Sequence, residues 1–219
     1  MIEIISQNVR GLGQEFKRRK VFHWLHKSKG SIFFLQETHS TKAIEKLWQS
    51  EWGGSNVFFA HGSSNSRGVC ILFKNSLSCE IHQCISDEFG RFIILDVTVS
   101  GTRILLCNVY GPNNDDPTFF QYVFEQMSAI EYDKLCIGGD FNVILDPDLD
   151  KHGGNPYKNQ NARHMVNTLM EECDLIDLWR VRNPGTQQYT FRCSHPEKIY
   201  TRLDYFLISS GICDQVENI

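Results

Sequence analysis

The chain has 219 residues, which suits one α/β domain with a sizeable core and is too short for two ordinary domains. Its net charge of −4 differs from the basic excess of proteins that bind DNA strongly and non-specifically, so any contact with nucleic acid should be local. The basic run at 17–20 is interpreted as a solvated helix face. With no apolar run of membrane-spanning length and no secretion signal, we expect an intracellular protein without a membrane partner.

Short apolar runs, rich in β-branched and aromatic residues and bounded by Gly, Asn, Ser or Asp, predict strands. They lie at 2–9, 31–35, 57–60, 69–74, 92–99, 104–110, 135–138, 189–191 and 203–208. Apolar residues at helical spacing predict helices at 16–26, 40–52, 119–130 and 162–173. Because the strands between 69 and 110 follow one another without a helix, we expect an α/β (α+β) fold in which two mixed sheets pack face to face with helices outside.

The eight cysteines form no CxxC pair, so we expect no zinc site. Cys70, Cys107 and Cys136 lie within apolar runs and are interpreted as reduced thiols of the core. This use of cysteine is typical of a reducing compartment.

Several predicted strands end in a polar residue where the chain leaves the sheet, and such strand ends are where α/β folds build their sites. Asn8 ends the first strand before a Gly-rich turn, and a turn role is the simpler explanation for it. Glu37 follows a strand that is apolar on both faces. Tyr110 ends another strand, and its hydroxyl could donate a hydrogen bond to a phosphate oxygen.

The strongest signal is the segment GGDFN at 138–142, in which two glycines allow a tight turn. Asp140 and Asn142 lie on one side of Phe141, and a carboxylate beside an amide suits hard-cation chemistry and the orientation of a water. Asp204 lies among apolar residues of a later strand. Because a buried charge needs a partner, Asp204 is a candidate for orienting a catalytic base.

Taken in chain order, the segments QNVRGL, LQET, NVYGP, GGDFN and RLDYFL resemble motifs of the endonuclease/exonuclease/phosphatase superfamily. The resemblance covers essentially the whole chain. It implies the four-layer αββα sandwich of deoxyribonuclease I and of the abasic-site repair endonucleases, formed by a single domain at 1–219. Together with the YTF segment at 189–191, it points in particular to the endonuclease domain of LINE-type (non-LTR) retrotransposons.

For that branch, the resemblance implies a magnesium-dependent endonuclease that nicks duplex DNA. The nick would leave a 3′-hydroxyl that primes reverse transcription on the cut target. The expected partners are therefore duplex DNA and a reverse transcriptase fused to this domain in the parent protein, and the expected location is the nucleus. We expect the domain to act as a monomer.

The resemblance also implies a role for each strand-end residue. Glu37 corresponds to a ligand of Mg²⁺, or of Mn²⁺, with Asn8 and Asp140 nearby, and this oxygen-only set suits those ions rather than zinc. Asp140 corresponds to the carboxylate that activates the water or protonates the leaving oxygen. Asn142 corresponds to the amide that holds the scissile phosphate, and Tyr110 to the phosphate-binding tyrosine.

Asp204 corresponds to the carboxylate that orients a catalytic histidine, which in the family lies in a Ser-Asp-His segment after a last strand. This sequence contains no Ser-Asp-His, and its last histidine, His195, precedes Asp204. We therefore expect the domain to be incomplete at its C-terminal end and this chain by itself to be inactive.

Substrate contacts are expected in two polar, irregular loops at 61–67 and 193–201, which we predict to determine the DNA sequence preference. Arg67 and Arg202 are the candidate DNA contacts, although Arg202 could equally pair with a nearby acid. Thr190 corresponds to a polar residue near the phosphate in the retrotransposon branch.

Two alternatives stay open. A repair-type abasic-site endonuclease would share the nicking residues and would differ in the loop after Tyr189, which accommodates the flipped sugar. A decayed copy or fragment would bind DNA or nothing, and the missing histidine is the feature that favours it.

Overall fold

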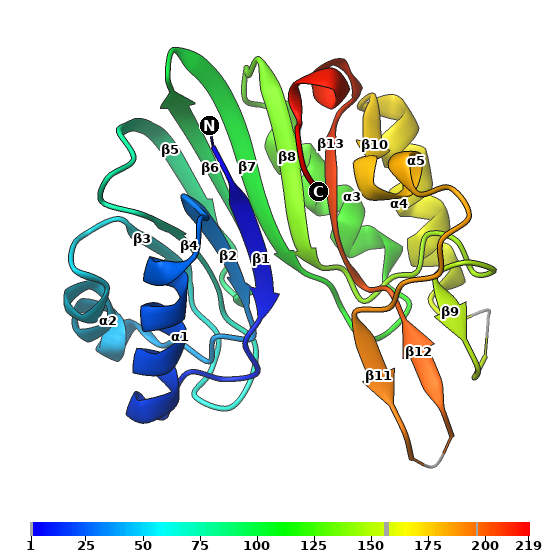
Figure 1. Ribbon diagram of the computed structural model, residues 1–219, viewed down its shortest axis with the longest axis horizontal. Coiled ribbons are helices and arrows are strands. Elements are labelled where there is room, and N and C mark those ends of the chain that lie inside the picture. Colours follow the sequence, from blue (N-terminus) through cyan, green and yellow to red (C-terminus); the bar gives the residue numbers. More distant parts are fainter. Residues whose placement is uncertain (1, 156–157, 196) are drawn as a thin grey trace.

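The computed structural model describes residues 2–155, 158–195 and 197–219. Two mixed β-sheets pack against each other, and helices cover the outer face of each (Figure 1). The first sheet is built from the first third of the chain and has the strand order β1 (Ile4–Asn8), β2 (Ile32–Gln36), β4 (Val69–Phe73) and β3 (Val57–Ala60). β1 and β2 are parallel, and the other neighbours are antiparallel.

The second sheet is built from the rest of the chain. Its strand order is β10 (Leu175–Asp177), β13 (Asp204–Ser209), β8 (Lys134–Asp140), β7 (Thr102–Tyr110), β6 (Phe92–Val99) and β5 (Cys79–Ser86). A small third sheet contains β11 (Phe191–Cys193), β12 (Ile199–Thr201) and β9 (Lys151–His152). The β11–β12 hairpin projects at the end of the molecule where β1 and β8 end and β13 begins (Figure 1).

The helices follow the predicted pattern. They are α1 (Glu15–Lys27), α2 (Glu45–Trp52), α3 (Pro117–Ser128) and α4 (Gln160–Glu172). Three agree with the sequence prediction to within two residues at each end, whereas α2 begins five residues later than expected, after the 3₁₀ turn η1 (Lys42–Ile44). In the basic run on α1, Arg18 is buried and binds Glu51, so the interpretation of that run as a wholly solvated face is wrong at this residue.

Three hydrophobic cores separate the layers. Ile32 and Phe34 of β2 face the second sheet, and the alternate residues Phe33 and Leu35 face α1 and α2. A third core lies between the second sheet and α3 and α4. This order of layers is the predicted αββα sandwich. Burial on both faces also explains why the central strands are continuous apolar runs in the sequence.

The structure contains an edge strand and several short elements that the sequence analysis did not predict. They are β5, β9, β10, α5 (Leu178–Arg182) and β12. The strand expected at 189–191 is β11, displaced by two residues. Within the described ranges, no helix is long and apolar enough to cross a membrane.

Candidate active site

Side chains from both sheets meet where β1 and β8 end. The amide nitrogen of Asn8, the last residue of β1, donates to Glu37 Oε1 and to Asp140 Oδ2, each at 2.9 Å. Glu37 directly follows β2, and Asp140 is the last residue of β8. Asp204, the first residue of β13, is the cross-strand partner of Asp140. One cleft is therefore lined by all four predicted residues.

The backbone around these residues is held in unusual conformations. Glu37 and Asn142 have φ of +50° and +53°, in the left-handed region that non-glycine residues seldom occupy. The Glu37 carbonyl is fixed by the backbone N–H of Gly11 at 2.6 Å. Asn142 donates its backbone N–H to Asp140 Oδ1 at 3.0 Å and its side-chain amide to the carbonyl of Gly111 at 2.9 Å. Such strain persists only where the surroundings fix it, as these bonds do.

Negative charge accumulates in the cleft. Burial raises the pKa of Asp140 to about 7, aided by the charge of Asp204 and, to a smaller degree, of Glu37, while hydrogen bonds from Asn8 and Asn142 oppose the rise. Burial also raises the pKa of Asp204, against the Thr190 hydrogen bond and the positive charge of Arg10. Carboxylates that repel one another in a buried place are stabilised by a cation.

Tyr110 lies beside these carboxylates at the end of β7, as the cross-strand partner of Asp140. Burial and the charge of Glu37 raise the pKa of Tyr110 to about 12, so its hydroxyl stays protonated and can act as a donor at neutral pH. The guanidinium of Arg91 lies 5.5 Å from the centre of the Tyr110 ring and donates to the Tyr110 and Gly111 carbonyls.

Thr190 lines the cleft beside Asp204, and its place near the phosphate stays a prediction. Its hydroxyl oxygen accepts the backbone N–H groups of Leu203 and Asp204 at 3.0 and 3.1 Å. Among the described residues, no histidine hydrogen-bonds to Asp204, and His195 is exposed and bonded to the Ser194 carbonyl.

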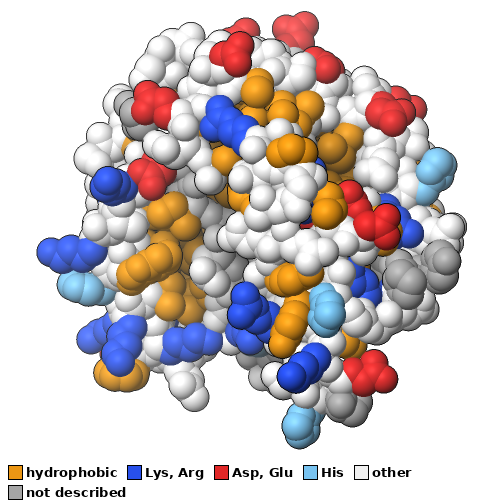
Figure 2. Space-filling model, turned by 45° about the vertical axis from the view of Figure 1, so that its right-hand side comes forward, with side chains coloured by type: hydrophobic (Ala, Val, Ile, Leu, Met, Phe, Trp, Pro, Cys, Tyr) orange, Lys and Arg blue, Asp and Glu red, His pale blue; other side chains and the backbone are white. Residues whose placement is uncertain are grey.

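Three cations that the sequence analysis did not single out also line the cleft: Arg10, Lys151 and Lys158. Arg10 could have been found, since it lies within the QNVRGL motif, two residues after Asn8. The lysines come from a later segment whose position no motif indicated. On the face shown in Figure 2, Lys and Arg side chains gather in the lower half and most Asp and Glu side chains in the upper half.

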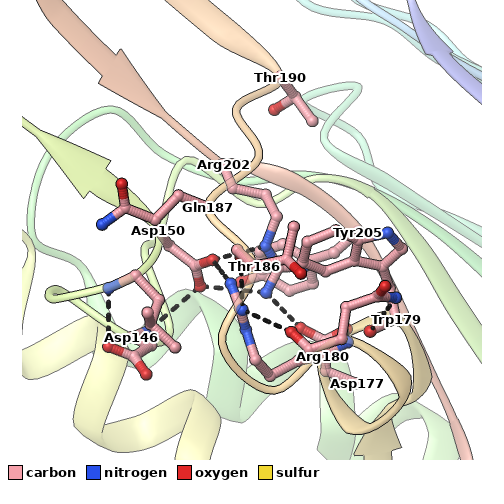
Figure 3. Close-up of polar contacts among 12 residues, drawn as sticks. Asp146, Asp150, Asp177, Trp179, Arg180, Thr186, Gln187, Thr190, Arg202 and Tyr205 are labelled. Carbon is pink, nitrogen blue, oxygen red and sulfur yellow. Dashed lines mark hydrogen bonds and ion pairs between the residues drawn. The ribbon is translucent and has the colours of Figure 1, made fainter.

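The expectation that Arg202 contacts DNA is wrong. Arg202 is 3% exposed, and its guanidinium binds Asp150 and Asp177 (Figure 3), so the acid-paired alternative is the correct one.

Arg67 lies in the loop before β4, outside the carboxylate cleft, and lines a separate pocket with Arg91. Its contact with DNA stays a prediction.

The two predicted specificity loops differ in form. The loop at 61–67 closes through a bridge between Ser63 and Ser66. The segment 193–201 forms the turn and second strand of the β11–β12 hairpin, in which Cys193 pairs with Ile199. Pro196, within that segment, lies outside the described residues.

The residues fit a hard divalent cation. No group of three or more His, Cys, Asp and Glu side chains in the described part of the chain is arranged as a metal cluster. However, Glu37 and Asp140 each accept a hydrogen bond from the same amide nitrogen of Asn8, so their carboxylates are neighbours in one cleft. Carboxylate oxygens of this kind are ligands that Mg²⁺ accepts while it keeps several waters.

A family model described as the Endonuclease/Exonuclease/phosphatase family matches residues 5–216. The chain belongs to this family. It is 33% identical, over 99% of its length, to an uncharacterized 149 kDa protein of transposon TX1 from Xenopus laevis, of which it spans 17%. Over 81% of its length it is 26% identical to a DNA-(apurinic or apyrimidinic site) endonuclease from Plasmodium berghei, of which the match spans 42%. The chain thus covers less than half of both relatives.

Several solved structures share the fold. The AP endonuclease LMAP from Leishmania major superimposes with a TM-score of 0.75 at 19% identity, covering 97% of this chain and 80% of that one. The endonuclease domain of TRAS1, a telomere-specific non-LTR retrotransposon, superimposes with a TM-score of 0.65 at 12% identity, covering 100% of this chain and 90% of that one. The chain is therefore similar to nucleases of both the repair and the retrotransposon kind.

Proposed function

We propose that the protein is the magnesium-dependent endonuclease domain of a non-LTR retrotransposon and that it nicks duplex DNA. The observation that carries the proposal is the convergence of Glu37 and Asp140 on one amide of Asn8, beside Asp204, in a cleft rimmed by cations. The identity to a transposon protein over 99% of the chain favours the retrotransposon branch. In the parent protein, the domain would be joined to a reverse transcriptase and act in the nucleus.

The chain's own residues can perform most of a phosphodiester hydrolysis. Asp140, with a pKa of about 7, can accept a proton from a water as its oxygen attacks phosphorus. Tyr110 can donate to a non-bridging phosphate oxygen, and Asn142 lies beside Asp140 to orient the phosphate. When bound at Glu37, with Asp140 nearby, Mg²⁺ would supply charge neutralisation at the phosphate and at the leaving oxygen. Breaking the bond from phosphorus to O3′ leaves a 3′-hydroxyl and a 5′-phosphate.

A plasmid-nicking assay with Mg²⁺ tests the proposal on the parent protein, because we expect this chain by itself to be inactive. We expect Glu37→Gln and Asp140→Asn each to lower the nicking rate at least about 10²-fold, since each removes charge that the cation and the water need. Glu131→Gln, at an exposed carboxylate on the turn before β8, is the matched control and should nick like the parent chain. Chelation of Mg²⁺ should abolish nicking, and a DNA polymerase should extend the nick directly.

Two results would count against this proposal. One is nicking that persists unchanged in Asp140→Asn. The other is a folded parent protein, which would carry the expected Ser-Asp-His segment, that cuts nothing with Mg²⁺ or Mn²⁺, and this would favour the inactive-copy alternative.

The second candidate function is cleavage at abasic sites, which is favoured by the 26% identity to the Plasmodium berghei endonuclease. Both functions use the same cleft, so they differ only in the substrate. Single-turnover rates on one duplex, with and without a single abasic site, separate them. A rate at least about 100-fold higher on the abasic duplex would assign the chain to repair.

A further inference from the structure

Next to the cleft lies a group of four charges, the ion cluster, formed by the buried Asp150, Asp177 and Arg202 and the half-buried Arg180 (Figure 3). Its two carboxylates and two guanidiniums balance in charge. Arg202 binds Asp150 with Nε and Nη2 at 2.7 and 3.0 Å, and its Nη2 also binds Asp177. Arg180 Nη2 also binds Asp150, at the oxygen Oδ1 that Arg202 Nε binds.

Arg202 is fixed at its backbone as well as at its side chain. Its N–H donates to the Asp150 carbonyl at 2.9 Å, and its guanidinium carbon lies 5.1 and 5.3 Å from the ring centres of Trp179 and Tyr205. Burial alone would lower the pKa of Arg202, but the bonds to Asp150 and Asp177 outweigh burial and raise it. Arg202 therefore stays charged and anchored.

Arg202 lies two residues before Asp204. The residues that follow Arg202 contact the residue after Asp140, at the end of β8. The carbonyl of Leu203 accepts the N–H of Phe141 at 2.9 Å. The ring of Tyr205 stacks on the ring of Phe141, with 4.2 Å between centroids and an angle of 11°. Displacement of Arg202 would therefore move Asp204 and, through Phe141, the adjacent Asp140.

The same cluster holds the segment that carries Thr190. Arg180 Nη1 donates to the carbonyls of Asn183 and Thr186 at 3.0 and 2.8 Å. Gln187, the next residue, donates to the Asp148 carbonyl at 3.3 Å. The chain then reaches Thr190, whose hydroxyl accepts the N–H of Asp204.

We propose that Arg202 is a positioning residue: through the ion cluster it fixes the distance and orientation of Asp204, Thr190 and Asp140, without touching the DNA. The inference rests on the proposed nuclease function. It differs from a purely structural role because it predicts a loss in the chemical step rather than in binding or folding.

The test compares Arg202→Met and Arg202→Lys with a matched control. Arg103→Met breaks another Arg–Asp pair, in which Arg103 binds the buried Asp96 at 3.0 and 2.7 Å, at the start of β7 and so at the opposite end of that strand from Tyr110. All variants are assayed for nicking of a short duplex at a temperature where circular dichroism shows them folded.

We expect Arg202→Met to lower kcat about 10²-fold with KM changed less than about 2-fold, because a misplacement near 1 Å costs about that much. Arg202→Lys keeps the charge but not the bidentate geometry of the guanidinium. Its kcat should be about 10-fold higher than that of Arg202→Met. Arg103→Met should keep kcat within about 2-fold. If Arg202→Met does not fold, the kcat of Arg202→Lys is compared with that of Arg103→Met instead.

A readout that does not need activity separates this inference from the function itself. The NMR signals of the Leu203 and Asp204 backbone amides, which report their bonds to Thr190, should shift in both Arg202 variants and stay in place in Arg103→Met. A parent chain that does not nick refutes the proposed function and leaves the amide signals to decide the positioning role. The positioning role is overturned if the amide signals do not move, or if Arg202→Lys and Arg103→Met lose kcat equally.

Discussion

Asp140 is a buried carboxyl whose raised pKa links the site to the stability of the protein. Its pKa rises from 3.8 to about 7, through burial first and the charge of Asp204 second. Between about pH 4 and pH 7, the folded protein therefore holds a proton that the unfolded chain has released. A carboxyl with a raised folded pKa stabilises the fold at low pH, and this stability is lost as pH rises through that window.

We expect the free energy of unfolding of the parent chain to fall between pH 4 and pH 7.5 by on the order of 2–4 kcal/mol more than that of Asp140→Asn. Urea unfolding at a series of pH values measures this difference. Asp214→Asn, at an exposed carboxyl, is the control and should keep the slope of the parent chain. Equal slopes in the parent chain and Asp140→Asn would contradict the buried charge of Asp140.

Asn8 is the only described side chain that hydrogen-bonds both Glu37 and Asp140, one carboxylate from each sheet. We expect Asn8→Ala to lower the nicking rate about 10–100-fold, since residues that orient metal ligands contribute effects of that size. Titration with Mg²⁺ should show that the variant also needs more of the ion for half-maximal rate. A normal rate at normal Mg²⁺ would show that Glu37 and Asp140 hold their positions without this bridge.

The sequence allowed the carboxylates and amides of the site to be predicted, because each follows an apolar strand that is easy to recognise. Glu37, Asp140 and Asp204 are brought to one cleft by the sheet register, which depends on those strands. Arg202 could not be assigned in the same way. Its partners Asp150 and Asp177 come from short segments that carry no motif, so whether its guanidinium faces solvent or a carboxylate depends on tertiary packing.

At the scale of elements, the close approach of β7 and β8 depends on a glycine. Gly139 has φ of +139°, and a Cβ there would lie 2.0 Å from the Val109 carbonyl oxygen of the neighbouring strand. We expect Gly139→Ala to destabilise the fold by about 3 kcal/mol or more, from overpacking and backbone strain together. Gly185→Ala, where a Cβ meets nothing within 4 Å, is the control for urea unfolding. Similar midpoints for both variants would contradict the tight β7–β8 contact.

The β11–β12 hairpin stands beside the cleft and is the element expected to select the DNA target. Exchange of its turn, 194–198, should change which steps are nicked while single-turnover chemistry stays nearly constant. β12 is excluded from the exchange because the carbonyl of Thr201 accepts the N–H of Thr190 at 3.0 Å. Sequencing of nicked products gives the answer, and an unchanged cutting pattern would refute this role of the hairpin.

The elements that the sequence analysis missed lack the local apolar pattern from which strands are predicted. β5 is an edge strand with mostly exposed or half-buried residues and a bulge between Ile81 and Gln83, so it lacks an apolar run. β9, β10 and β12 have two or three residues each, too few for any period to be visible. Their pairing comes from contacts distant in sequence. The long strands and helices, by contrast, are set by local apolar pattern and were predicted.

For DNA binding by the molecule as a whole, the distribution of charge matters more than the net charge of −4. Arg10, Lys151 and Lys158 line a cleft that also holds carboxylates, so DNA binding should be weak and moderately sensitive to salt. Three phosphate contacts would give a slope of log affinity against log salt of about −2 to −3. Lys158→Gln should reduce the slope by about one and leave kcat unchanged, measured by fluorescence anisotropy and nicking. A slope near zero would contradict a phosphate-binding role of these three cations.

Because the first sheet is complete by Phe73 and the second begins at Cys79, the two sheets come from successive parts of the chain, its first third and the remainder. A ribosome therefore finishes the half that carries Asn8 and Glu37 long before it adds Asp140 and Asp204. During that interval, the apolar inner face of the first sheet lacks the second sheet that covers it in the folded protein. The carboxylates meet only after the start of β13 has emerged. The proposed nuclease activity would therefore arise only once this last part of the chain has been made.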